Sequence, residues 1–218
     1  GVPLETLRDG LANWARVDLV GSSFGVLKLT FQSETVDVAL PRTEQSTGVH
    51  HRDFQISADP TLSLETDLAR RDFTVNAMAK RLSDGALIDP FGGERDLEGR
   101  VLRAVGDANE RFLEDPLRML RLARFIAKLG FTPDSATARA TSHHAALIGS
   151  VALERIQTEL LGLLASRSAP AILESLRFLR DTGLLTVIVP EFAACIGFDQ
   201  ANPHHDLTLD EHIFQAVH

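Results

Sequence analysis

Residues 114–131 constrain the fold of this chain more than any other segment. The segment begins with two acidic residues and Pro116, which suits the first turn of a helix, and ends near Gly130, which suits a helix C-terminus. Apolar residues recur between them with the spacing of one helix face. These positions are Leu117, Leu120, Ala123 and Ala127. The pattern therefore predicts a helix with one buried side.

The first part of the chain predicts a small sheet. Apolar and β-branched runs at residues 17–20, 24–31 and 35–40 are separated by short polar turns, as is typical of neighbouring strands. Residues 41–60 are polar and follow neither a helical nor a strand period. We expect a long loop there, a length that compact domains use mainly for function.

A second helix is predicted at residues 64–80, entered through Ser63 as its N-cap, and a short strand follows from Ala86. Helices then dominate the sequence. Besides the helix in residues 114–131, the predicted elements are helices at 134–146, 153–165 and 169–182, and a buried apolar turn at 184–190. The predicted fold class is α+β, with a sheet-containing N-terminal part followed by an all-helical part.

Composition excludes several classes of protein. The 218 residues are 44% hydrophobic, which is enough to bury a core, and one cysteine, Cys195, cannot form an intramolecular disulfide. No apolar run reaches the roughly 18 residues that a membrane span needs, and the N-terminus carries no secretion signal, so the expected location is the cytoplasm. The net charge of −8 argues against a general nucleic-acid binder, because such domains are usually basic.

The basic residues are unusual in type. Only three of the 22 are lysines, so 19 are arginines, and seven of these lie between Arg95 and Arg124. A guanidinium offers a planar fork of donors that binds phosphates and base edges in a fixed geometry. Ordinary ion pairing with the 30 acidic residues is the alternative.

Spacing places four of these charged residues together. Arg118, Arg121 and Arg124 lie three apart and form a polar ridge along the predicted helix, and Asp115 lies beside Arg118 at its start. A carboxylate accepts from an exocyclic amine while a guanidinium donates to a ring nitrogen. Cytosine and adenine present that pattern, whereas uracil and guanine present a carbonyl. The alternative is that Asp115 caps the helix and pairs with Arg118, which spacing alone favours.

Three blocks in a fixed order carry a resemblance. They are Arg-Arg-Asp-Phe-Thr within residues 68–79, Ile-Asp-Pro-Phe-Gly-Gly within 88–97, and Glu-Asp-Pro-Leu-Arg within 111–125. Together they closely resemble the bacterial class II tRNA nucleotidyltransferase and poly(A) polymerase family, within the polymerase-β-like nucleotidyltransferases. The resemblance implies three domains: a partial nucleotidyltransferase head at residues 1–105, a nucleotide-selecting neck at 106–150, and a helical body at 151–218 that runs into the start of an HD-like region.

The resemblance also implies residue roles. Arg71 would contact the nucleotide triphosphate, and Asn76 would lie near the incoming sugar and phosphates. Asp115 and Arg118 would form the amino-acid template that selects CTP or ATP, supported by Arg121 and Arg124. For Arg70, Asp72 and Asp96, a role in the site and ion pairing within the fold are equal alternatives. The implied partners are the acceptor end of tRNA, CTP and ATP.

The implied cofactor is Mg²⁺, which carboxylates hold while a 3′ hydroxyl attacks an α-phosphate. Asp37 resembles the third active-site carboxylate of the family, so it is the candidate catalytic and metal residue. The family's Gly-Gly turn and Asp-x-Asp pair do not occur ahead of it. We therefore expect an N-terminally truncated portion of the enzyme, inactive by itself. His212 resembles the first ligand of an HD-type metal site, which the chain does not complete.

The predicted activity is addition of C and A to the 3′ end of tRNA with release of pyrophosphate. The shared blocks leave an A-adding enzyme, a CC-adding enzyme and a bacterial poly(A) polymerase open. A hypothesis from a different functional class is a catalytically inactive relative that binds RNA or nucleotide. It is motivated by the missing Asp-x-Asp pair.

Overall fold

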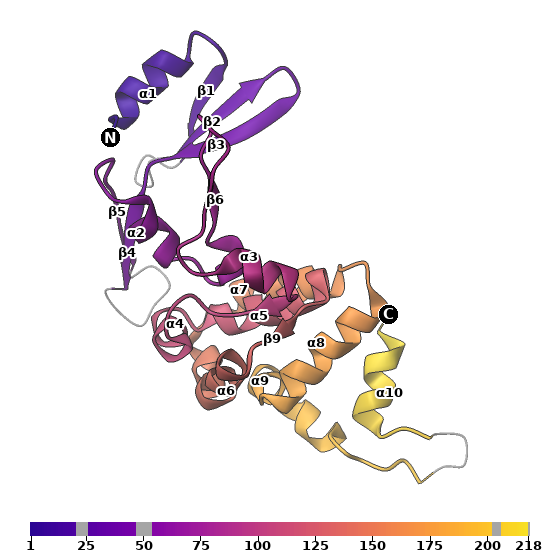
Figure 1. Ribbon diagram of the computed structural model, residues 1–218. Helices are drawn as coiled ribbons and strands as arrows, with labels where there is room; N and C mark the ends of the chain where they lie inside the picture. Colours follow the sequence, from indigo (N-terminus) through magenta and orange to yellow (C-terminus); the bar gives the residue numbers. More distant parts are fainter. Residues whose placement is uncertain (21–25, 47–53, 202–205, 218) are drawn as a thin grey trace. The chain divides into compact units, whose positions relative to one another are not determined.

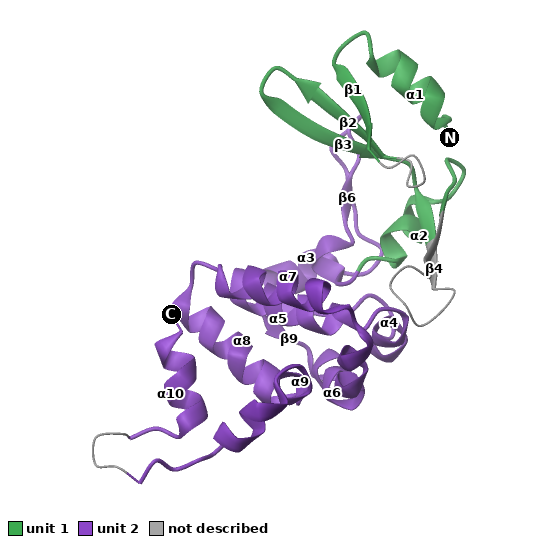
Figure 2. Cartoon of the chain, turned by 180° about the vertical axis from the view of Figure 1, so that it is seen from behind, with its two compact units in different colours: residues 1–71 green, residues 72–218 purple. Residues whose placement is uncertain are grey.

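A computed structural model describes residues 1–20, 26–46, 54–201 and 206–217. The chain divides into two compact units, Gly1–Arg71 and Asp72–His218 (Figure 2). The predicted division into residues 1–105, 106–150 and 151–218 stays a prediction. Among the described residues, no helix has the length and apolar character to cross a membrane.

Unit 1 contains an antiparallel three-stranded sheet. Its strands, β1 (Arg16–Val20), β2 (Val26–Phe31) and β3 (Glu34–Ala39), pair in sequence order, which confirms the predicted small sheet. Helix α1 (Leu4–Leu11) precedes the sheet and was not predicted. Leu27 on β2 is fully buried, while most of β3 is exposed.

The prediction of a loop at residues 41–60 is wrong. Strands β4 (Arg42–Ser46) and β5 (Phe54–Ala58) form an antiparallel pair in this segment, and residues 47–53 lie outside the described part of the chain. The pairing runs from Arg42 opposite Ala58 to Ser46 opposite Phe54. A two-stranded ladder is held by backbone hydrogen bonds, so it does not require the apolar alternation on which the prediction depended.

The helix predicted at residues 64–80 is also too long. Helix α2 (Leu64–Ala69) begins at Ser63, whose hydroxyl accepts from the Thr66 N–H at 3.1 Å, so the predicted N-cap is confirmed. The chain then becomes extended at Phe73, followed by the 3-10 helix η1 (Thr74–Asn76). The Thr74 N–H donates to the Arg103 carbonyl at 2.9 Å, so a tertiary backbone bond replaces helix continuation here.

Unit 2 is mainly helical (Figure 1). Its N-terminal part contains the pair β6 (Ala79–Lys80) and β7 (Leu87–Ile88), then α3 (Gly93–Glu98), and β8 (Val101–Leu102), which pairs in parallel with β9 (Thr132–Pro133). The remaining elements are α4 (Ala108–Glu114), α5 (Leu117–Leu129), α6 (Ser135–His144), η2 (Ala145–Ser150), α7 (Leu153–Leu164), α8 (Ala169–Asp181), α9 (Leu184–Ile188), η3 (Pro190–Cys195) and α10 (Leu209–Ala216). The predicted helices α5, α6, α7 and α8 are confirmed. The apolar turn expected at 184–190 is instead the short helix α9, because Leu184 is fully buried and Gly183 allows the preceding left-handed turn.

Helix α5 is the centre of unit 2. It packs against α7 and α8, which lie beside it in Figure 1. Its predicted apolar face is buried throughout, at Leu117, Leu120, Ala123 and Ala127. Gly130 ends the helix in the left-handed conformation (φ 66°), as its position predicted. The polar face of α5 is thereby fixed in orientation by the core behind it.

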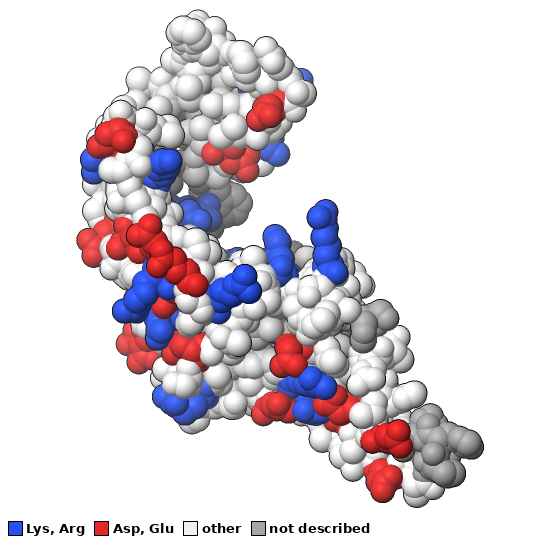
Figure 3. Space-filling model, turned by 45° about the vertical axis from the view of Figure 1, so that its right-hand side comes forward, with Lys and Arg blue, Asp and Glu red and all other residues white. Residues whose placement is uncertain are grey.

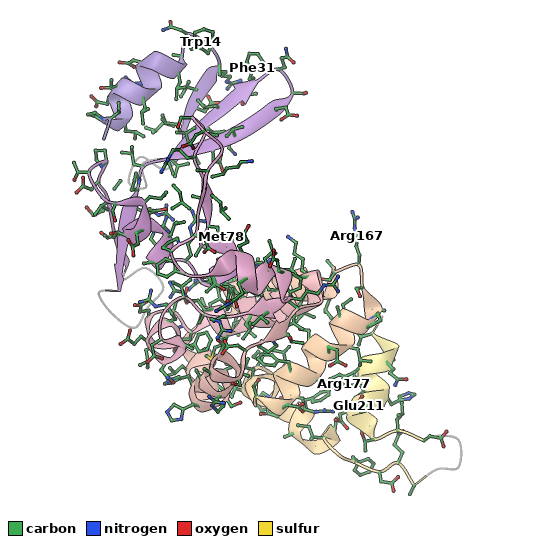
Figure 4. The ribbon with its side chains drawn as sticks, viewed as in Figure 1. Trp14, Phe31, Met78, Arg167, Arg177 and Glu211 are labelled. Carbon is green, nitrogen blue, oxygen red and sulfur yellow. The ribbon has the colours of Figure 1, made fainter. Side chains whose placement is uncertain are left out.

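Gly93 lies at the start of α3 with no room for a side chain. A Cβ there would lie 2.2 Å from the Thr74 carbonyl oxygen and 2.8 Å from Cγ of Met78, which is labelled in Figure 4. We expect G93A to lower the free energy of unfolding by about 3 kcal/mol, measured by urea unfolding, because the backbone must move. G10A in α1 is the matched control, since its Cβ would meet nothing within 4 Å. Equal stability of the two variants would contradict the clash.

Helix α10 is attached to α8 by ion pairs. Arg177 reaches Glu211 at 2.8 Å, a contact visible at their labels in Figure 4, and Arg180 reaches Asp210 at 2.7 Å. Burial would raise the pKa of Asp210, but hydrogen bonds from Thr208, Arg180 and the Gly197 N–H outweigh it and lower the pKa to about 2. The ionised carboxylate therefore stabilises the packing of α10.

This pKa predicts an acid-sensitive attachment. Because the folded pKa of Asp210 lies below its ordinary value of 3.8, its contribution is complete above about pH 5 and is lost as the pH falls through 4 towards 2. We expect wild type to lose about 2 kcal/mol more unfolding free energy than D210N between pH 6 and pH 2. Urea unfolding at each pH measures this difference. The same pH slope in both proteins would contradict it.

Candidate functional site

The three arginines of the α5 ridge alternate with carboxylates. Asp72 lies between two of them, with Oδ1 3.2 Å from Nε of Arg118 and Oδ2 2.6 Å from Nε of Arg121. Glu159 on α7 lies between the next two, 3.8 Å from Nη1 of Arg121 and paired with Nε of Arg124. We call these five residues the α5 ladder. Asp72 is 14% and Glu159 is 9% exposed, so the ladder is not an ordinary solvated helix face.

The predicted ion pairing of Arg70, Asp72 and Asp96 is present. Arg70 donates to Asp67 at 2.7 Å, and the buried carboxylate of Asp96 accepts from Arg103 at 3.0 Å. In Figure 3, acidic and basic side chains lie against one another over the helices of unit 2. These arginines are paired with carboxylates, so they do not form a uniformly basic surface.

Asp115 lies at the junction of α4 and α5. It is extended (φ −144°, ψ 99°) and precedes Pro116, so α4 ends and α5 begins on either side of its side chain. Its Oδ1 accepts from the Leu117 N–H at 3.1 Å, and its Oδ2 accepts from Nη2 of Arg155 at 3.0 Å. The helix capping weighed for Asp115 is therefore real, while its ion-pair partner is on α7.

Arg118 is held on the other side of the same turn. Its Nη1 lies 3.0 Å from Oε2 of Glu114, its Nε faces Asp72, and its side chain is only 9% exposed. The Arg118 N–H also donates to the Asp115 carbonyl at 3.0 Å, which fixes the two residues on one turn. A carboxylate acceptor and a guanidinium donor thus lie side by side in a partly buried setting, each with its own counter-charge.

The remaining predicted residues are in different places. Arg71, at the end of unit 1, is 45% exposed and its Nη2 lies 3.8 Å from Asp67. Asn76 in η1 accepts from the Phe73 N–H at 3.2 Å. Asp37 is exposed on β3, directly opposite Lys28 on β2. His212 is exposed on α10. The structure gathers Asp115, Arg118, Arg121 and Arg124 in unit 2 but leaves Asp37 and Arg71 in unit 1.

The described residues do not form a complete Mg²⁺ site. Within the described ranges, no group of three or more histidine, cysteine, aspartate or glutamate side chains could hold a metal ion. Mg²⁺ requires near-octahedral oxygen coordination, which the single carboxylate of Asp37 does not supply. His212 has no such group around it in the same ranges either. The metal roles of Asp37 and His212 stay predictions.

Sequence reasoning did not single out four residues of this site, Asp72, Glu114, Arg155 and Glu159, as holding the template and the ladder. Three of them, Asp72, Arg155 and Glu159, come from outside the α4–α5 segment. The available signal for Glu159 and Arg155 was their spacing of four on α7, which places both on one helix face. That face could be assigned to α5 only with the packing known.

Comparison with known proteins agrees with the geometry. A family model described as "Poly A polymerase head domain" matches residues 3–103, and one described as "Probable RNA and SrmB- binding site of polymerase A" matches residues 130–196. Together they match more than half of the chain. The chain belongs to the tRNA nucleotidyltransferase and poly(A) polymerase family. The resemblance of the three sequence blocks is thereby confirmed.

Individual relatives of this family are similar over most of the chain. A multifunctional CCA protein of Xanthomonas campestris pv. campestris is 42% identical over 191 residues, covering 85% of this chain and 45% of the relative. That of Stenotrophomonas maltophilia is 44% identical over 174 residues, covering 78% and 41%. The chain thus spans less than half the length of these curated relatives.

Solved structures of the family share the fold. The Bacillus stearothermophilus CCA-adding enzyme in complex with CTP is 34% identical, with a TM-score of 0.70, over 83% of this chain and 41% of that one. A tRNA nucleotidyltransferase complexed with a primer tRNA and an incoming ATP analog is 29% identical, with a TM-score of 0.69, over 91% and 53%. The predicted α+β class of this family is confirmed.

Proposed function

We propose that the protein containing this chain adds C and A nucleotides to the 3′ end of tRNA and releases pyrophosphate. The observation that carries the proposal is the placement of Asp115 and Arg118 on one turn, each held by separate counter-charges. A carboxylate and a guanidinium in this order match the amine and ring nitrogen of cytosine and adenine. The names of the relatives, multifunctional CCA protein and CCA-adding enzyme, support the same activity.

The remaining residues have supporting roles in this proposal. Arg71 binds the triphosphate, and its exposed guanidinium is suited to a phosphate contact. Asn76 lies near the sugar and phosphates, while Arg121 and Arg124 support the nucleotide through the α5 ladder. Residues 1–105 act as the head, 106–150 as the nucleotide-selecting neck and 151–218 as the body. The partners are the tRNA acceptor end, CTP and ATP, and we place the reaction in the cytoplasm, where tRNA matures.

Mg²⁺ is the cofactor expected for the whole protein, because the family generally uses a divalent metal. The described residues of this chain do not supply a complete set of its ligands, so Asp37 is proposed only as one member of that set.

Nucleotide incorporation tests the function. The full-length protein and the 218-residue chain are each given tRNA lacking its 3′ CCA, Mg²⁺ and one labelled nucleoside triphosphate at a time. We expect C-then-A addition by the full-length protein and none by the chain alone. Addition of C alone or A alone would replace the proposal with a CC-adding enzyme or with an A-adding enzyme or poly(A) polymerase. No addition by either would indicate a protein that only binds RNA or nucleotide.

A further inference from the structure

Asp115 and Arg118 have an attractive alternative to binding a base, which is to pair with each other. They carry opposite charges and share one turn, since the Arg118 N–H donates to the Asp115 carbonyl at 3.0 Å. A direct ion pair would consume the acceptor and the donor that a nucleobase needs. A site that reads the base must therefore keep the two side chains engaged elsewhere and still open to a ligand.

The structure keeps them engaged through different partners. Arg118 is held by Asp72 at 3.2 Å and by Glu114 at 3.0 Å. Asp115 is held by Nη2 of Arg155 at 3.0 Å, an arginine on α7 and not on the α4–α5 segment. α7 packs against α5, so the guanidinium of Arg155 reaches the junction from a separate, fixed element.

The Arg155 contact leaves acceptor capacity on Asp115. A carboxylate has about four lone-pair positions. The Leu117 N–H occupies one on Oδ1 and Arg155 occupies one on Oδ2, at 3.1 and 3.0 Å. Both oxygens can therefore accept a further bond from an amine while the carboxylate plane is held by two donors. The Asp115 side chain is 18% exposed, so a ligand can approach it.

We propose that Arg155 is a positioning residue for nucleotide selection, which holds the Asp115 carboxylate away from Arg118 and presents it to the amine of cytosine or adenine. This inference rests on the proposed function. Without Arg155, Asp115 turns to Arg118, and the acceptor–donor pair that distinguishes C and A from U and G is lost. Arg155 itself does not contact the nucleotide.

The test uses R155A, R155K and D115A, alone and in combination, in the full-length protein. We expect R155A to lower kcat/KM for CTP and ATP by about tenfold or more and to raise incorporation of UTP relative to CTP by a similar factor, with R155K in between. R155A placed in a D115A background should have no further effect on that ratio, because Arg155 acts through Asp115. R81A is the matched control, since it removes an exposed arginine–aspartate pair, with Asp84 at 2.9 Å.

Two outcomes of the incorporation assay would overturn the proposal. One is wild-type discrimination by R155A, and the other is an equal loss for all four nucleotides that persists in the D115A background, as general loss of packing would give. A crystal structure of R155A provides a readout independent of activity: Asp115 turned onto Arg118 supports the inference, and an unmoved carboxylate contradicts it. If the wild-type protein adds neither C nor A, the proposed function fails, while this structure still decides the role of Arg155.

Discussion

D115A is expected to incorporate UTP almost as readily as CTP. The Asp115 carboxylate accepts from the amine of cytosine or adenine and repels the carbonyl oxygen that uracil and guanine present in the same place. Removing it abolishes both effects, so we expect the ratio of CTP to UTP incorporation to fall by about tenfold to a hundredfold. Steady-state incorporation with each labelled nucleotide measures this ratio.

The same substitution also leaves Arg155 without its carboxylate at 3.0 Å, which costs some stability. Thermal unfolding therefore accompanies the assay, and D115N, which retains one acceptor oxygen, serves where D115A folds poorly. D181A is the matched control, because Asp181 is 64% exposed and pairs with its neighbour Arg180 at 2.8 Å. Wild-type selectivity in a folded D115A protein would disprove the template assignment.

Sequence patterns predicted the elements whose signals are local. Helix α5 follows from its apolar period and from Gly130, and the start of α2 follows from Ser63, because caps and periods depend on residues a few positions apart. The errors occur where hydrogen bonds between backbone segments far apart in the sequence determine the secondary structure. Thr74 bonds to the Arg103 carbonyl and ends the helical continuation, although the residues from 64 to 80 are locally compatible with a helix.

The candidate site shows the same division. Asp115 and Arg118 were identified from their spacing and from a family block, since both lie on one turn. Asp72 lies 46 residues before Arg118 and 49 before Arg121. Arg155 lies 40 residues after Asp115, and no helical or strand period relates residues at such separations. Ion pairs between elements depend on how helices pack, so only the structure could show that the arginine ridge is a ladder of alternating charge.

R71A is expected to lower incorporation of all four nucleotides without changing their ratio. Every nucleoside triphosphate presents the same phosphates, so a contact made there is independent of the base. The Arg71 guanidinium is 45% exposed and lies 3.8 Å from Asp67, a longer separation than the 2.7 Å of Arg70 from the same carboxylate. Arg71 can thus turn to a ligand with little loss of folding energy. We expect kcat/KM to fall by about a hundredfold for each nucleotide.

R70A provides the contrast, because the two arginines are adjacent and share Asp67. Arg70 is 18% exposed and holds a carboxylate that is itself 12% exposed, so its removal should lower the free energy of unfolding by about 1–3 kcal/mol. R71A should change stability by less than about 0.5 kcal/mol. The two variants therefore separate a phosphate contact from a structural one. If R71A instead retains most of its activity, or shifts the ratio of CTP to UTP as D115A does, then Arg71 does not bind the triphosphate.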